Sequence, residues 1–291
     1  MKILRAKSAG FCRGVERAIT IARKYAHLGK AHVFTDGPLI HNNQMMEELA
    51  REGVRELKSS GDRGELTVEL SPDEKKQSVI IVRAHGVTPQ RREYLKSLGM
   101  EFRDATCPDV AAIAGKVKTY SKKGYTVVVF GDPKHPEVVG ILGHAAGKSF
   151  VVKTLDDIAA LPAGESQICM VSQSTMYVDE FEKLAAALTT RFPDALVFNT
   201  ICRATRDRQG DVPALVTAGA EAVIVIGGRH SANTIKLVGL VERQRVPCFH
   251  IETPDELDLA ALSRYAVVGV TAGASTPGFL IDKVCETLAP L

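Results

Sequence analysis

The sequence predicts an α/β protein made of three pseudo-symmetric αβα units, with mainly parallel sheets around a central cavity. Three cysteines recur at two equal intervals of 95 residues: Cys12, Cys107 and Cys202. Three histidines follow them at intervals of 94 and 95 residues: His41, His135 and His230. Between these markers, patterns typical of helices alternate with buried strand-like runs, which indicates parallel strands joined by helical crossovers.

The first unit is predicted over residues 13–104. Val15 and Ile19 stand at helical spacing after the first cysteine, which favours a helix there. A strand-like run with an Asp-Gly turn follows at 32–37, and a second apolar run begins at Ser78. The order is therefore cysteine, helix, strand, glycine turn, histidine, and then a second strand.

The second unit, residues 105–198, repeats this order. Val110, Ile113 and Val117 give the helical spacing, and Thr126 to Phe130 form an apolar run of strand length. The run Ile-Cys-Met-Val-Ser supplies the second strand of the unit.

The third unit is predicted over residues 199–291 plus 1–12. A more polar helix ends near Ala218, a buried strand follows at 222–226, and a last apolar run ends in Thr-Ala-Gly-Ala-Ser. In open α/β sheets, ligands bind beyond the carboxyl ends of the strands. Because the cysteines, histidines and second loops all follow strands, we expect them to converge on one cavity.

Composition excludes several classes of protein. The net charge is +3 and the charged residues are 24% of the chain, which is too balanced for a nucleic-acid-binding protein. No apolar run approaches the roughly 20 residues of a membrane helix, and the N-terminus lacks the apolar core of a signal peptide. We therefore expect a soluble cytoplasmic protein with no membrane partner. Its six widely spread cysteines are expected to be thiols or metal ligands rather than disulfides.

The three spaced cysteines predict a metal site with one ligand from each unit. Three thiolates bind either zinc or an iron–sulfur cluster that has one iron without a protein ligand. No Cys-x-x-Cys pair of a zinc ribbon occurs, and ligands so far apart in the chain suit a larger cofactor at a domain junction. The alternative, three ordinary core cysteines, is disfavoured by their shared interval. Cys169, Cys248 and Cys285 share neither interval nor context, and we expect them to serve packing.

The spaced histidines predict an anion pocket. Each precedes a predicted helix start, where backbone N–H groups favour negative charge. His85 lies on the second loop of the first unit, and Ser174 and Ser275 occupy the matching loops of the other two. Imidazole and hydroxyl donors without a Walker-type loop suit a diphosphate. The histidines that have no repeat partner are expected to be cap or loop residues: His27, His32, His144 and His250.

Glu137 is the one carboxylate in the first turn of a helix that begins beside a candidate pocket histidine. Such a carboxyl group is a plausible proton carrier near a metal cluster. The alternative is a helix N-terminal acid that only interacts favourably with the helix dipole. The sequence pattern leaves both interpretations open.

At these residues the chain resembles the 4-hydroxy-3-methylbut-2-enyl diphosphate reductase family, also called LytB. The resemblance covers the whole chain and is specific, because the matching blocks follow one another in the family's order. These blocks are Gly10 to Ala18, Ile40 to Asn42, Ala84 to Val87, Asp104 to Pro108, His135 to Val138, Ser172 to Thr175 and Thr271 to Ser275.

The resemblance implies an iron–sulfur reductase that removes the hydroxyl group of 4-hydroxy-3-methylbut-2-enyl diphosphate, the last step of the non-mevalonate isoprenoid pathway. It implies one [4Fe–4S] cluster per chain on the three spaced cysteines, and ferredoxin or flavodoxin as electron donor. Glu137, Ser174 and His135 would be the catalytic residues, with Glu137 delivering protons. The substrate would be bound by His41, His85, His135, Ser174, Ser231, Asn233 and Ser275, with Ser174 at its alcohol and the other six at its diphosphate.

The chain departs from the family pattern at three positions that bear on the site. Ala232 stands where the family has a second Ser beside Ser231, which removes one phosphate donor. Ser174 replaces a Thr and keeps its hydroxyl group. Gly278 replaces an acidic residue outside the pocket.

Overall fold

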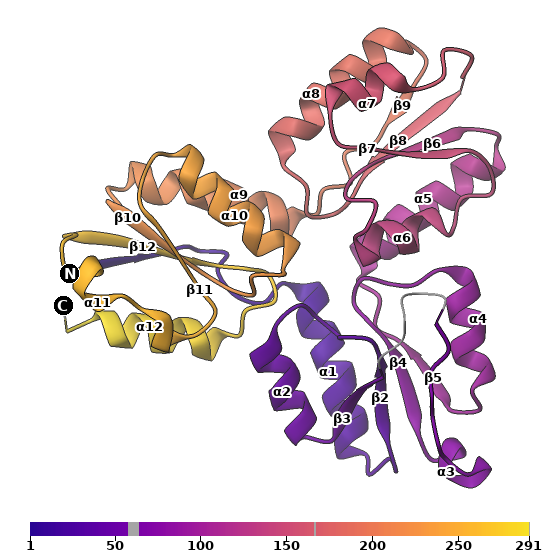
Figure 1. The fold of residues 1–291 in the computed structure, drawn as a ribbon, viewed down its shortest axis with the longest axis horizontal. Coiled ribbons are helices and arrows are strands. Elements are labelled where there is room, and N and C mark those ends of the chain that lie inside the picture. Colours follow the sequence, from indigo (N-terminus) through magenta and orange to yellow (C-terminus); the bar gives the residue numbers. More distant parts are fainter. Residues whose placement is uncertain (58–63, 166, 291) are drawn as a thin grey trace. The chain divides into compact units, whose positions relative to one another are not determined.

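The computed structural model describes residues 1–57, 64–165 and 167–290. This part of the chain contains three sheets, each of four strands, with helices packed on their faces (Figure 1). All the strand pairs are parallel. The fold class predicted from the sequence, three αβα units with parallel sheets, is therefore confirmed.

The chain forms two compact bodies. The terminal body consists of Met1–Val15, His41–Met45 and Cys202–Leu291. The central body consists of Glu16–Ile40 and Met46–Ile201. The central body holds two of the three sheets and the terminal body holds the third.

The first sheet has the strand order β3-β2-β4-β5. Its two inner strands are buried along their whole length, because their runs of apolar and β-branched residues suit a sheet covered on both faces. The elements of this region are α1 (Arg13–His27), β2 (Val33–Asp36), α2 (Asn43–Arg51), β3 (Val54–Leu57), α3 (Pro72–Lys76), β4 (Val79–Val82), α4 (Pro89–Ser97) and β5 (Glu101–Asp104).

The second sheet repeats this topology in the order β7-β6-β8-β9. Alternate residues of β6 face opposite layers: Val127 and Val129 pack with residues of α5 and α6, whereas Val128 and Phe130 pack with residues of α7 and α8. The elements are α5 (Pro108–Lys122), β6 (Thr126–Phe130), α6 (Pro136–Leu142), β7 (Ser149–Val152), α7 (Leu155–Ala160), β8 (Ile168–Ser172), α8 (Val178–Arg191) and β9 (Leu196–Val197).

The third sheet has the order β11-β10-β12-β1, so the N-terminal strand completes it. Val223 and Val225 pack with residues of α9 and α10, and Ile224 and Ile226 pack with residues of α12 on the other face. Figure 1 shows these helices on the two sides of the sheet. The elements are β1 (Lys2–Arg5), α9 (Arg203–Thr217), β10 (Ala222–Ile226), α10 (Ala232–Arg243), β11 (Cys248–Ile251), the 3₁₀ turn Pro254–Glu256, α11 (Leu259–Leu262), β12 (Val267–Ala272) and α12 (Gly278–Leu288).

The three sheets share one arrangement. In each, the two inner strands are the two strand-like runs that the sequence pattern predicted, and the loops that follow them lie at the same edge because parallel strands end together. This edge carries the predicted site residues of each sheet. Within the described residues, no helix combines the length and the apolar character needed to cross a membrane.

Candidate functional site

Each of the three spaced cysteines stands immediately before a helix. Cys12 precedes α1, Cys107 is the N-cap of α5 and Cys202 is the N-cap of α9. All three side chains are partly exposed. A helix N-terminus stabilises the thiolate form, which is the form that binds metals. The three positions therefore share the local geometry of metal ligands.

Backbone contacts hold the cysteine-bearing turns against the ends of inner strands. The amide of Cys107 donates to the carbonyl of Ala84 at 2.9 Å, two residues beyond β4. In the terminal body, the amide of Cys12 donates to the carbonyl of Ala274 at 3.1 Å, two residues beyond β12. Each thiol thus belongs to the edge of the sheet where ligands are expected.

Cys202 makes a cap interaction of its own. Its Sγ accepts a hydrogen bond from the backbone N–H of Thr205 at 3.4 Å and lies 3.2 Å from Oγ1 of Thr205. Both contacts stabilise negative charge on the sulfur atom.

The other three cysteines serve packing, as the sequence indicated. Burial raises the pKa of the Cys169 thiol in β8 to about 11, and burial likewise raises the pKa of Cys248 in β11 to about 11. Burial also raises the pKa of Cys285 in α12. Thiols with raised pKa values are poor nucleophiles and poor ligands at neutral pH.

In the central body, Glu137 and Ser174 form a buried pair. Glu137 lies in the first turn of α6 and its residue surface is 2% exposed. Its Oε1 accepts from the backbone N–H of Ser174 at 2.6 Å, and its Oε2 accepts from Oγ of Ser174 at 2.8 Å. Ser174 follows β8 and is also buried. Hydrogen bonds therefore join a carboxylate and a hydroxyl group from two different strand ends.

Two histidines of the central body contact each other. The rings of His85 and His135 lie edge to face, with their centroids 5.5 Å apart. His135 is the N-cap of α6, and its Nδ1 accepts from the backbone N–H of Glu137 at 3.2 Å. In the neutral tautomer that this bond selects, the ring proton is on Nε2.

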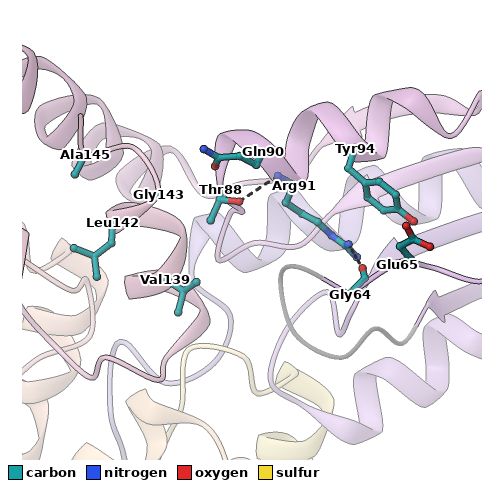
Figure 2. A pocket seen from close by; sticks show the side chains of 10 residues that line it. All are labelled: Gly64, Glu65, Thr88, Gln90, Arg91, Tyr94, Val139, Leu142, Gly143 and Ala145. Carbon is teal, nitrogen blue, oxygen red and sulfur yellow. Dashed lines mark hydrogen bonds between the residues drawn. The ribbon is translucent and has the colours of Figure 1, made fainter. Parts of the chain in front are cut away.

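Two cavities lie within the central body. One of about 230 Å³ is bordered by His85 and Gly140. The other, of about 810 Å³, lies between α4 and α6 (Figure 2). Its Arg91 donates to the carbonyl of Gly64 and is paired with Asp36. None of the predicted site residues lines the larger cavity, whereas His85 lines the smaller one.

In the terminal body, His41 lies beside the loop after β12. Oγ of Ser275 donates to the carbonyl of His41 at 3.0 Å. The rings of His41 and His230 lie edge to face with centroids 5.7 Å apart. His41 thus packs with residues far from it in sequence.

The N-terminus of α10 presents two further predicted residues. Ser231 is the N-cap, and its Oγ accepts from the backbone N–H of Thr234. Asn233 is 7% exposed, and its Nδ2 is a buried donor with no hydrogen-bond partner among the described residues. An unsatisfied buried amide at a helix N-terminus suits an anionic ligand, because such a donor is costly to leave unpaired.

The structure brings the predicted residues together in two groups. The central body joins His85, His135, Glu137 and Ser174 through the contacts above. The terminal body holds Cys12, His41, Cys202, Ser231, Asn233 and Ser275.

Sequence reasoning missed Thr205 and Arg208. Both are buried on α9, on the same face as Val212. The sequence does hold one signal that could have identified them: both polar residues stand at helical spacing on the face of this helix that is otherwise apolar.

Fold and site together define a class of protein: an α/β protein whose strand ends carry thiol, imidazole, amide and hydroxyl groups close to helix starts. Comparison with known sequences gives the family. The profile described as LytB protein matches residues 3–289, and the chain belongs to this family.

Related sequences match this chain over its full length. A protein of Opitutus terrae named 4-hydroxy-3-methylbut-2-enyl diphosphate reductase is 55% identical over 292 residues and covers 100% of both chains. One of the same name from Caldanaerobacter subterraneus is 38% identical and covers 100% of this chain and 98% of that protein.

Solved structures of the same kind also match. The E-1-hydroxy-2-methyl-but-2-enyl-4-diphosphate reductase of Plasmodium falciparum superposes with a TM-score of 0.87 at 27% identity, covering 99% of this chain and 88% of that one. An (E)-4-hydroxy-3-methyl-but-2-enyl diphosphate reductase described as the terminal enzyme of the non-mevalonate pathway gives a TM-score of 0.72 at 34% identity. The match covers 100% of both chains. These matches confirm the resemblance inferred from the sequence.

Proposed function

We propose that this protein is an iron–sulfur oxidoreductase that converts 4-hydroxy-3-methylbut-2-enyl diphosphate to isopentenyl and dimethylallyl diphosphate, the last step of the non-mevalonate pathway. The family and the names of its full-length relatives support this activity. The observation in the site that carries the proposal is the buried pair of Glu137 and Ser174 beside the histidine pair. It combines a proton-carrying group with a hydroxyl-binding group, as loss of a hydroxyl group requires.

The proposed cofactor is one [4Fe–4S] cluster with Cys12, Cys107 and Cys202 as its three protein ligands. The residues fit such a group, because each is a partly exposed thiol at a helix start. When bound, a cluster with three protein ligands supplies electrons one at a time and an iron able to act as a Lewis acid. Zinc would use the same thiols but would supply no electrons.

The proposed diphosphate site consists of six residues with hydrogen-bond donors: His41, His85, His135, Ser231, Asn233 and Ser275. Two features support it. Nδ2 of Asn233 is buried without a partner among the described residues, and Ser231 is the N-cap of α10. Neutral donors at helix starts bind phosphate oxygens well. Ala232 supplies no side-chain donor at this helix start, so the proposed phosphate contacts there come from Ser231 and Asn233.

Ser174 is proposed to bind the substrate hydroxyl group, and Glu137 is proposed to donate a proton to it. Because Oγ of Ser174 donates to Oε2 of Glu137, its lone pairs remain able to accept a hydrogen bond from the substrate alcohol. Glu137, once protonated at Oε2, would pass that proton to the departing hydroxyl group. The C–O bond breaks, water leaves, and a second proton adds to carbon as two electrons enter.

The electron donor is proposed to be ferredoxin or flavodoxin, and the location cytoplasmic. We also propose that the chain comprises three domains with the boundaries 13–104, 105–198 and 199–291 plus 1–12. The shared strand order of the three sheets supports this division.

Anaerobic purification followed by a visible spectrum and a turnover assay tests the proposal. We expect a brown protein with iron–sulfur absorbance that shifts when the diphosphate substrate is added. The reduced protein should consume the substrate and give the two isomeric products. A colourless protein with one zinc ion per chain, or a brown protein that does not consume the substrate, would contradict the proposal.

A further inference from the structure

Arg208 is a buried cation in the terminal body, on the helix that begins after Cys202. Its residue surface is 3% exposed. Its guanidinium donates to the carbonyl of Gly10, two residues before Cys12, and at 2.7 Å to the carbonyl of Ala204, two residues after Cys202. One side chain therefore joins the backbone next to two of the spaced cysteines.

This cation has no carboxylate partner. No ion pair to Arg208 occurs among the described residues, and its Nε is buried without a hydrogen-bond acceptor. Oδ2 of Asp211 accepts from the N–H and Oγ of Ser8 at 2.8 and 2.6 Å. Asp207 pairs with Arg203 at 3.5 Å and is exposed. Both acids thus bond to other groups, and their charges raise the pKa of Arg208 less than those of Cys12 and Cys202 do.

Thiols take the place of a carboxylate beside Arg208. Burial lowers the pKa of its guanidinium, and the next largest influences, which raise that pKa, are the charges of Cys12 and Cys202. Both sulfur atoms therefore lie within electrostatic reach of the guanidinium. Arginine nonetheless stays protonated in proteins, so the side chain carries a full buried charge.

An unpaired buried charge is strongly destabilising, so a side chain of this kind persists where a negative charge compensates it. Cysteines that bind a metal do so as thiolates and carry that negative charge. The alternative, a purely structural arginine, would be expected to hydrogen bond through all its donors or to pair with a carboxylate. Arg208 does neither, because its Nε has no acceptor and both nearby acids bind other groups.

We propose that Arg208 is a positioning residue for the cofactor. It ties the turn before Cys12 to the start of α9 and supplies the positive charge that balances the thiolates of Cys12 and Cys202 when they hold the iron–sulfur group. The inference rests on the proposed ligand set. A fixed cation beside an iron–sulfur group favours its reduced, more negative state, so Arg208 raises the reduction potential.

Redox titration of cluster-loaded protein tests this inference. The variants are Arg208→Gln, which removes the charge, and Arg208→Lys, which keeps it. Arg206→Gln is the matched control, because Arg206 lies exposed on the same helix, where solvent screens its charge. Iron per chain is measured after anaerobic reconstitution, and the fraction of reduced cluster is measured at fixed potentials from the visible spectrum.

We expect Arg208→Gln to lower the ratio of reduced to oxidised cluster about tenfold at a given potential, which corresponds to about 59 mV for one electron. It should also lose iron faster. Arg208→Lys should keep the wild-type ratio within about twofold, and Arg206→Gln should match the wild type.

The outcomes separate this inference from the ligand assignment. Wild-type potential in a cluster-loaded Arg208→Gln would overturn the inference alone, as would an equal fall in the Lys and Gln variants. If circular dichroism shows that the Gln variant does not fold, the Lys variant is the test. A tenfold fall in its ratio of reduced to oxidised cluster would overturn the role of charge, and a wild-type ratio would support that role. A wild-type protein that binds no iron would overturn both the inference and the ligand set.

Discussion

At the scale of single residues, Glu137 is fixed by two hydrogen bonds that both come from Ser174. This contact joins the first turn of α6 to the loop after β8, so the carboxylate does not depend on substrate for its orientation. A buried carboxylate with both oxygens accepting hydrogen bonds is oriented in advance, which is a requirement for effective proton transfer.

Replacing Glu137 with Gln tests its role. Gln keeps the shape, and its amide oxygen can still accept from Ser174, but it cannot carry the proton. We expect the brown colour and iron content to stay unchanged while turnover falls by about 10²-fold or more, measured as product formed by reduced enzyme. Glu182→Gln is the control, since Glu182 lies exposed on α8 and is not one of the predicted site residues. Normal turnover in Glu137→Gln would remove the proton role.

Sequence reasoning located single residues where a repeat or a chemical type distinguished them. The three proposed ligand cysteines were separated from Cys169, Cys248 and Cys285 by their interval and sequence context, and burial of Cys169 and Cys248 supports that division. Arg208 was not foreseen, because a charged residue in a polar helix is normally exposed and only the fold reveals its burial.

At the scale of elements, the end of α6 packs closely against the start of α4. Gly143 is the C-cap of α6, and a Cβ atom there would lie 2.6 Å from Cγ2 and 3.2 Å from Cα of Thr88. Thr88 is the N-cap of α4, and its Oγ1 accepts from the backbone N–H of Arg91 at 3.1 Å (Figure 2). The threonine therefore cannot turn away without losing this cap.

We expect Gly143→Ala to lower the free energy of unfolding by about 1–3 kcal/mol, because the added methyl group overpacks this contact. Urea unfolding followed by circular dichroism measures the change. Gly147→Ala is the matched control, since nothing lies within 4 Å of a Cβ atom at this nearby glycine. Equal stability of the two variants would show that Thr88 relaxes.

The inner strands and the long helices were predictable, and the outer strands were not. β6 and β10 are uninterrupted apolar runs, whereas β9 has only two residues and β5 carries Glu101 and Asp104. Edge strands are buried less completely, so neither apolar periodicity nor composition marks them clearly. The helix starts after His41, His135 and His230 were foreseen from their polar first turns.

At the scale of the whole molecule, one strand order occurs three times and places one spaced cysteine before one helix in each repeat. The repeat was visible in the sequence because the intervals between cysteines were equal. The packing of His41 within the terminal body was not visible in the sequence, because it depends on contacts with Ser275 and His230, which are remote from His41 in the chain.

Replacing one cysteine tests the shared ligand set. Cys107→Ser should fold with an unchanged far-ultraviolet circular dichroism spectrum, since Cys107 is partly exposed and Ser is a good N-cap. We expect iron and sulfide content after reconstitution to fall several-fold, because serine is a poor iron–sulfur ligand. Cys285→Ser, which removes a thiol on α12, should keep its full iron content. Full iron in Cys107→Ser would exclude Cys107 as a ligand.

The pairing of β1 with β12 also has a consequence for the order of assembly during synthesis. Lys2 to Arg5 are synthesised before the two sheets of the central body, whereas Val267 to Val270, which pair with them, are synthesised after both sheets. The two sheets of the central body can close while synthesis continues, but the third sheet must wait. Cys12 therefore reaches its place in the terminal body only after β12 has been synthesised, and under the proposed ligand set the iron–sulfur group is inserted after that point.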